Sequence, residues 1–184
     1  MSLSSEKYSL FILDSEDGII PCQGSGVFRL KHGQEYKVKI CNHNLTSRID
    51  AEIMIDGKKI GVFRVNANSS ITVERPADDE KARKLTFFDF RSTEARRAGL
   101  VDNFMLGRID VNISVETSAL DTPYVTWEAD GDECDGVDGL GGTGLGAASS
   151  QKFRTCRPIE VQRCKVHLNG RMLLSNDNTP VVPL

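Results

Sequence analysis

The sequence lacks a long hydrophobic run and an excess of basic residues, and each absence excludes a class of protein. A membrane-spanning helix needs about 20 consecutive apolar residues, and no run in these 184 residues approaches that length. The first apolar run, residues 8–13, is also too short for the core of a signal peptide. Proteins that bind a phosphate backbone usually carry an excess of basic residues, whereas this chain has a net charge of −3 at pH 7. We therefore expect a single water-soluble domain with no membrane segment, no secretory signal and no nucleic acid partner.

Cysteine and aromatic residues are also scarce. The sequence contains an odd number of irregularly spaced cysteines, namely Cys22, Cys41, Cys134, Cys156 and Cys164. None forms a pair with the two-residue spacing of zinc-binding motifs, and a chain of this length does not need disulfides to fold. Reduced thiols in the cytoplasm or in a virus particle are the simplest interpretation. Aromatic residues make up 7% of the chain, with one tryptophan, so stacking platforms for sugars are few.

Two segments resemble ion-binding or phosphate-binding loops, but both depart from the required pattern. In the acidic run 130–138, the fifth and sixth positions of a calcium loop fall on Cys134 and Asp135, where an oxygen ligand and a glycine are needed. Residues 139–146 are rich in glycine but lack the Lys-Ser/Thr ending of a phosphate-binding loop. We expect a solvated Gly/Asp-rich loop over residues 129–150, whose glycines allow tight turns or close packing against a sheet edge. The sequence predicts no cofactor and no metal site.

Alternation of apolar and polar residues predicts a series of half-buried strands. The pattern occupies residues 34–42, 49–55, 58–65 and 70–74. Asp56 and Gly57, between the second and third of these strands, suit the type I′ turn of a β-hairpin. Because all the connections are short, we expect the four strands to be antiparallel neighbours.

The second half of the chain continues the β pattern with one short interruption. Strands are predicted over residues 85–90, 107–115, 124–128 and 159–168, the last with a bulge near Arg163. Ser92 as N-cap and Gly99 as stop predict a short helix over residues 92–98. Asn169-Gly170 predicts a second hairpin that sends residues 171–174 back. The strand pattern places five residues in the core, namely Ile53, Ile55, Ile109, Val111 and Ile113.

Phe87, Phe88 and Phe90 lie among basic residues, a mixture that also occurs in surfaces that bind single-stranded nucleic acid. Interleaved acidic residues cancel most of this charge, so we expect aromatic core residues with a salt-bridged rim. Metal ligation by Cys41 with His43, or by Cys164 with His167, is conceivable. The second pair falls on opposite faces of a regular strand, and no local signature supports a Cys–His nucleophile. The sequence therefore predicts no enzyme.

The stretch Ser92–Gly99, followed by Asp102-Asn103, Gly107 and the strand over residues 109–115, resembles a group of small uncharacterised β-sandwich proteins of bacteria and large DNA viruses. The glycine-rich residues 141–146 carry the same resemblance, which covers about half of the chain. It implies a β fold and no catalytic residues. The shared residues look architectural, with Asp102-Asn103 turning the chain and Gly107 opening a strand.

These patterns predict an all-β fold: a single two-sheet antiparallel β-sandwich of residues 1–184, jelly-roll or immunoglobulin-like, with one short helix. The first functional hypothesis is a non-catalytic structural or protein-interaction module, such as a component of a virus particle, that binds a protein partner or itself. The alternatives are a carbohydrate- or polar-ligand-binding module and a hydrolase on a β scaffold. The extended tail, residues 176–184, carries the predicted partner-binding residues Pro180, Val181, Val182, Pro183 and Leu184, which we expect to dock on a sheet edge.

Overall fold

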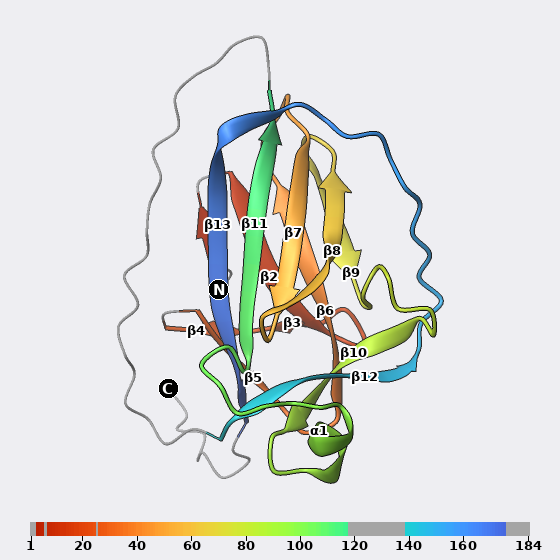
Figure 1. Ribbon diagram of the computed structural model, residues 1–184. Coiled ribbons are helices and arrows are strands. Elements are labelled where there is room, and N and C mark those ends of the chain that lie inside the picture. Colours follow the sequence, from red (N-terminus) through yellow and green to blue (C-terminus); the bar gives the residue numbers. More distant parts are fainter. Residues whose placement is uncertain (1–2, 6, 25, 118–138, 176–184) are drawn as a thin grey trace.

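Thirteen strands and one short helix make up the described part of the chain in a computed structural model that describes residues 3–5, 7–24, 26–117 and 139–175 (Figure 1). One sheet contains β1 (Leu3–Ser5), β2 (Tyr8–Asp14), β3 (Ile19–Ile20), β6 (Gln34–Asn42), β9 (Ser69–Val73), β10 (Arg83–Asp89) and β12 (Gly141–Ala148). The other contains β4 (Cys22–Gln23), β5 (Val27–Leu30), β7 (Ile49–Ile55), β8 (Lys58–Val65), β11 (Arg108–Glu116) and β13 (Val161–Leu174). Within the described ranges, no helix is both long and apolar enough to span a membrane. The predicted all-β class is confirmed.

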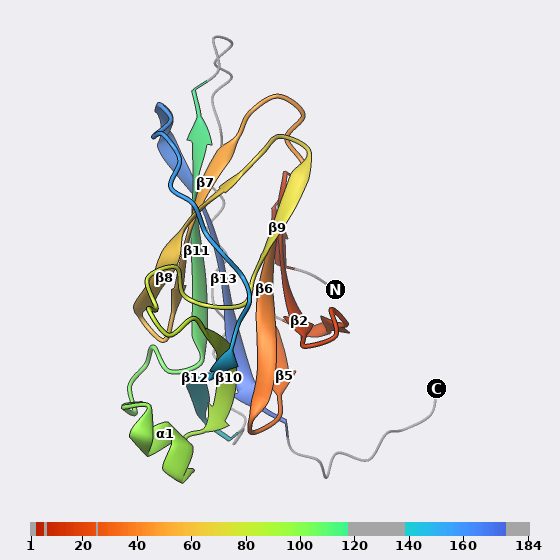
Figure 2. The ribbon, with the colours of Figure 1, turned by 90° about the vertical axis from the view of Figure 1, so that its right-hand side faces the viewer.

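The two sheets lie face to face with one hydrophobic core between them (Figure 2). The alternation seen in the sequence explains this arrangement, because β6, β7 and β11 each bury every second side chain toward the other sheet. The five predicted core residues, Ile53, Ile55, Ile109, Val111 and Ile113, are all at most 2% exposed. The predicted core face is therefore confirmed.

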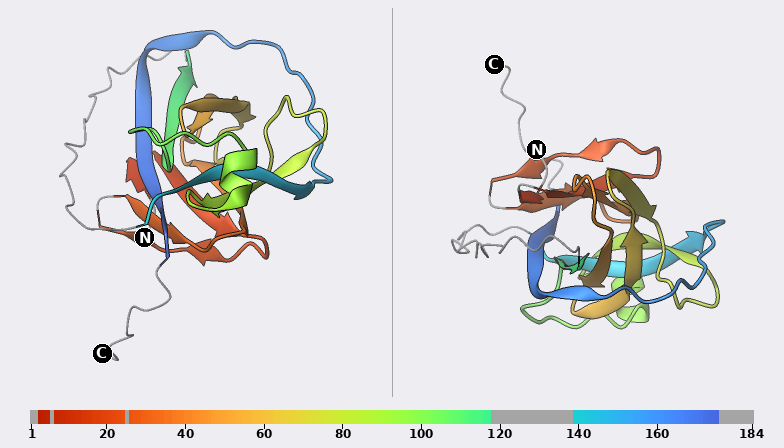
Figure 3. Two further views of the ribbon diagram at one scale, coloured as in Figure 1. Left: turned by 60° about the horizontal axis from the view of Figure 1, so that its bottom comes forward. Right: turned by 90° about the horizontal axis from the view of Figure 1, so that it is seen from above.

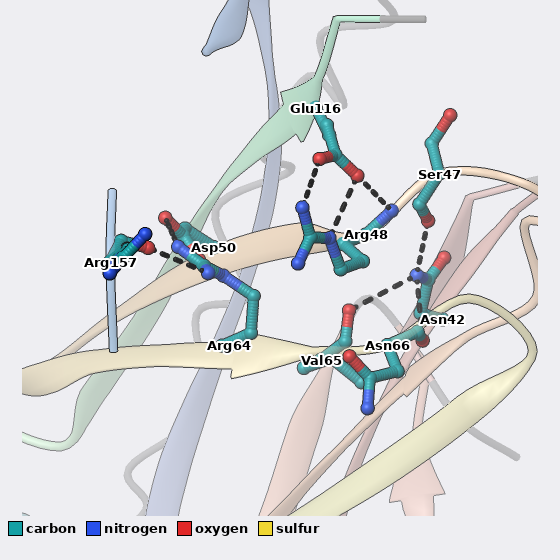
Figure 4. A network of polar contacts seen from close by, with 9 residues as sticks. All are labelled: Asn42, Ser47, Arg48, Asp50, Arg64, Val65, Asn66, Glu116 and Arg157. Atoms are coloured by element: carbon teal, nitrogen blue, oxygen red, sulfur yellow. Dashed lines mark hydrogen bonds and ion pairs between the residues drawn. The ribbon is translucent and has the colours of Figure 1, made fainter. Parts of the chain in front are cut away.

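The short connections between the predicted strands do not all join neighbours. β7 and β8 pair as predicted, but β6 and β7 belong to different sheets, as do β8 and β9. The reason is that the loops after β6 and after β8 cross between the sheets at the same end of the molecule (Figure 2). The buried amide of Asn42 holds both crossings, since its Nδ2 donates to the carbonyl oxygens of Ser47 (2.9 Å) and Asn66 (3.0 Å) (Figure 4).

Two local predictions are confirmed in detail. Asp56 and Gly57 have φ values of 52° and 73°, as a type I′ turn requires, and connect the antiparallel pair β7–β8. The helix α1 (Thr93–Arg97) begins after Ser92, whose side chain accepts a hydrogen bond from the backbone N–H of Ala95 at 3.0 Å. It ends before Gly99, which has a φ of 69°.

The hairpin predicted at Asn169-Gly170 is wrong. Both residues lie within β13, opposite Asp110 and Ile109 of β11, and the strand then continues beside β5 in a parallel pair. A Cβ on Gly170 would lie 2.9 Å from the carbonyl oxygen of Gly26, so the glycine serves close packing rather than a turn. The bulge predicted near Arg163 is confirmed, because the β11 register shifts between Ser114↔Lys165 and Glu116↔Val161.

The predicted loop over residues 129–150 is also wrong where the structure describes it. Residues 141–148 form β12, which pairs antiparallel with β10, whereas residues 129–138 and the predicted strand 124–128 lie outside the described residues. The glycines are needed because aromatic side chains of β10 lie across β12. A Cβ on Gly141 would be 2.1 Å from Cζ of Phe87, and one on Gly144 would be 2.4 Å from Cε2 of Phe88. Of the two expected roles, tight turns or close packing against a sheet edge, these glycines thus serve close packing, but within a strand of the sheet and not in a loop.

Candidate functional site

The predicted partner-binding residues, Pro180, Val181, Val182, Pro183 and Leu184, lie outside the described residues, and their docking stays a prediction. The acidic run 130–138 also lies outside them. A sheet edge that such a segment requires is present, however, in β12. This strand is the last in the order of its sheet, so among the described strands only β10 pairs with it.

The free edge of β12 presents backbone groups in a defined pattern. The N–H of Thr143 donates to Oδ2 of Asp56 at 2.6 Å, so it points away from β10. Alternate residues of a strand direct their backbone groups to the same edge. Leu145 therefore presents its N–H and C=O to the free edge, together with the C=O of Thr143. A short extended segment could pair with these groups.

A groove of about 670 Å³ runs across this edge, and we call it the β12 groove. Half-buried apolar side chains line both of its sides, with Leu145 on the side of the core and Phe88 and Ala98 on the side of α1, whereas Ile55, Ile60 and Leu85 lie buried beneath them. The helix packs on the outer face of β10 and β12 (Figure 3), where the glycines leave room for it. The groove is thus apolar both above and below the free strand edge.

Charged residues of both signs form the rim of the β12 groove. They are Lys58, Lys59, Asp78, Asp79, Arg83, Glu94 and Arg97. Arg83 pairs with Asp79 at 3.0 Å, and Lys59 pairs with Glu52 at 3.0 Å. Because the charges nearly balance, the rim favours neither an anionic nor a cationic ligand, and the apolar walls dominate what the groove can bind.

Asp56 joins three distant segments next to Thr143, which lines the groove. Its two carboxylate oxygens accept the backbone N–H groups of Gly107 and Thr143, each at 2.6 Å. Burial raises the pKa of Asp56 to about 6, although these two hydrogen bonds act in the opposite direction. Next to it, the buried hydroxyl of Tyr36 hydrogen-bonds Oγ1 of Thr143 at 2.6 Å. Both carboxylate oxygens are engaged by the backbone, so Asp56 has a structural role in joining the β7–β8 turn to β11 and β12.

A second hollow of about 490 Å³ lies on the outer face of the sheet that also contains β12, on its strands β2, β6 and β9. Its lining includes the half-buried Phe11 beside Lys39 and Thr72, which share one face of the sheet through direct cross-strand pairing. Lys37 also lines it and pairs with Asp17 at 2.7 Å. An aromatic ring next to a cation and a hydroxyl is an arrangement that suits a polar ligand.

The other candidates from the sequence have structural partners. His43 Nε2 lies 3.0 Å from Oγ of Ser9, and Nδ1 of His167 lies 2.7 Å from Oδ1 of Asn112. Phe87 is buried in the core, which removes it as a stacking surface for nucleic acid. In the part of the chain that the structure describes, no three His, Cys, Asp or Glu side chains form a possible metal site.

A network of ion pairs ties β7, β8 and β11 together (Figure 4). The Arg64 guanidinium binds both oxygens of Asp50, at 2.5 and 2.9 Å, and also donates to the carbonyl oxygen of Arg157. Arg48 binds Glu116 in the same two-pronged way. These hydrogen bonds hold the pKa of Glu116 below its ordinary value. Every one of these charges has a partner, so the network indicates stabilisation rather than a binding site.

Comparisons with known proteins found no family model that matches this chain, no matching curated protein and no matching solved structure.

Proposed function

We propose that this protein is a non-catalytic protein-interaction module, a β-sandwich that forms part of a larger assembly such as a virus particle. The observation that carries the proposal is the free edge of β12 with apolar walls on both of its sides. Exposed strand edges pair readily with other extended segments, and proteins that remain monomeric usually cover them.

Exposed apolar side chains give a second line of support. Val101 and Phe104, in the loop between α1 and β11, are 65% and 76% exposed. This loop has a fixed shape, because Oδ1 of Asn103 accepts the N–H of Met105 and Arg171 donates to the carbonyl oxygen of Phe104. Two large apolar side chains in one loop of fixed shape offer a site that a partner protein could cover.

The test is the size of the particle that the chain forms. Multi-angle light scattering on the purified protein, over concentrations from about 1 to 100 μM, should show an increase in mass with concentration. The double variant Val101→Ser, Phe104→Ser should shift this association to higher concentration without changing the melting temperature by more than about 2 °C, because both side chains are exposed. A monomer at every concentration, together with a monomer in material from the source, contradicts the proposal.

A polar-ligand-binding module remains the alternative, and the outer-face hollow with Phe11, Lys39 and Thr72 is the observation that favours it. Calorimetric titration with acidic and neutral oligosaccharides tests it directly. Binding that is lost in Phe11→Ala and retained in Phe88→Ala places a sugar in the outer-face hollow. The third hypothesis, a hydrolase, gains no support from Asp56, because backbone N–H groups occupy both of its carboxylate oxygens.

A further inference from the structure

We propose that residues 179–184 of this protein bind in the β12 groove and add a short strand to the free edge of β12. The inference deepens the proposed function, since it names the surface and the segment through which copies of the chain associate. It depends on three observations: the backbone groups that the free edge of β12 presents, the apolar lining of the groove, and the position of Ser175, the last residue described.

The backbone pattern of the segment fits the length of the edge. Proline has no N–H to donate, and alternate residues of a strand face the same edge. In Thr179-Pro-Val-Val-Pro-Leu184, Val182 and Leu184 can both direct their N–H groups to β12 while Pro183 faces away. The free edge offers a matching short set, the C=O of Thr143 and the N–H and C=O of Leu145. The segment and the edge can therefore pair over about two residues.

The side chains of the segment fit the two walls of the groove. When Val182 and Leu184 lie on one face of the added strand, Val181 and Pro183 lie on the other. A segment that is apolar on both faces needs a site that is apolar on both sides of the strand edge. The β12 groove has this property, since half-buried Leu145 lines one side and half-buried Phe88 lines the other. An ordinary exposed sheet edge would bury only one of the two faces.

The described chain ends beside the residues that lead into β12. The N–H of Leu174 donates to the carbonyl oxygen of Gly139 at 3.1 Å, two residues before β12 begins (Figure 1). Leu145 lies six residues beyond Gly139, a distance of about 20 Å along an extended strand. Val182 lies seven residues beyond Ser175, and an extended chain covers at most about 25 Å over that length. The segment reaches its own groove only when almost fully extended, and it reaches the groove of an adjacent copy more easily.

Photo-crosslinking on the full chain locates the segment. A photoreactive phenylalanine analogue placed at Val182 should form adducts with peptides that contain residues 58–60, 83–98 or 141–146. The same analogue at Leu45, which is 77% exposed, is the control and should give none of these adducts. Adducts from position 182 that fall only elsewhere, or their absence at full photolysis, overturn the inference. A mixture of isotope-labelled and unlabelled protein shows whether the groove belongs to the same copy.

Amide hydrogen exchange gives an independent measurement on the same site. The Leu145 N–H faces the free edge, whereas the Gly144 N–H faces β10. In the full-length variant Val182→Asp, Leu184→Asp, exchange at Leu145 should become at least tenfold faster while exchange at Gly144 stays unchanged. Equal exchange at Leu145 in both proteins contradicts the inference. If the protein is a monomer and the crosslinks form within one copy, the proposed assembly role is contradicted and the docking of residues 179–184 is supported. If the protein associates without these crosslinks, the assembly role is supported and the docking is contradicted.

Discussion

Replacing Asp56 with asparagine should change how the stability of this protein depends on pH. The carboxylate of Asp56 binds the backbone of Gly107 and Thr143, and burial there raises its pKa from 3.8 to about 6. A raised pKa means that the folded state favours the protonated form more than the unfolded state does. The stability that Asp56 contributes is therefore fully present below about pH 4 and is lost as the pH rises through about 6. Asparagine does not titrate, so the variant lacks this loss.

The size of the effect follows from the shift. One pKa unit corresponds to about 1.4 kcal/mol, so the change from 3.8 to about 6 amounts to about 3 kcal/mol. The free energy of unfolding of the starting protein minus that of Asp56→Asn should thus fall by about 2.5 kcal/mol between pH 4 and pH 7.5, because pH 4 already lies slightly above the ordinary pKa of 3.8. All other titrating groups cancel in this difference to a first approximation.

Urea denaturation followed by far-UV circular dichroism, at half-unit steps from pH 4 to pH 7.5, measures this difference. Asp102→Asn removes an exposed carboxylate and controls for the loss of one charge. A difference between the starting protein and Asp56→Asn that stays constant over the whole range would refute the reasoning, because it would mean that burial does not penalise the ionised form. A difference that grows with pH would show that the two N–H donors of Gly107 and Thr143 outweigh burial.

Three further predictions test the core, β12 and the ion-pair network. Val111→Asp places an unpaired carboxylate at a position with 0% exposure, which should cost several kcal/mol; a variant that melts normally would show that the core face is wrong. Gly144→Ala brings a Cβ within 2.4 Å of Phe88 and should lower stability by about 1–3 kcal/mol, and adding Phe88→Leu should recover part of the loss; without such recovery, the clash is not the cause. A double-mutant cycle with Arg64→Met and Asp50→Asn should give a coupling energy of about 1 kcal/mol in urea denaturation, whereas zero coupling would mean that solvent screens the pair.

The sequence alone determined those elements whose cause is local. Alternation in β6, β7 and β11 places their side chains on two faces whatever the rest of the chain does, so the five core residues could be predicted. The Asp56-Gly57 turn and the Ser92 cap each depend on residues that are close together in the sequence. These features needed no knowledge of the partner strands.

Only the tertiary structure decided where glycine serves packing instead of a turn. Gly170 carries a strong turn signal, yet the long pairing of β13 with β11 and the backbone of Gly26 require it within a strand. The glycines of β12 look like a loop because the reason for them lies on β10, in Phe87 and Phe88. When a glycine makes room for a side chain that is distant in the sequence, the residues next to it in the sequence do not reveal this role.

The candidate site was likewise a product of long-range contacts. The sequence predicted a segment that needs a sheet edge, but which strand would be last in its sheet follows from pairings between residues far apart in the chain. Asp56 was visible only as a turn residue, because its partners Gly107 and Thr143 follow it by 51 and 87 positions. Strand order, sheet membership and the β12 groove are set by which faces bury each other, and that choice is made by the whole chain at once.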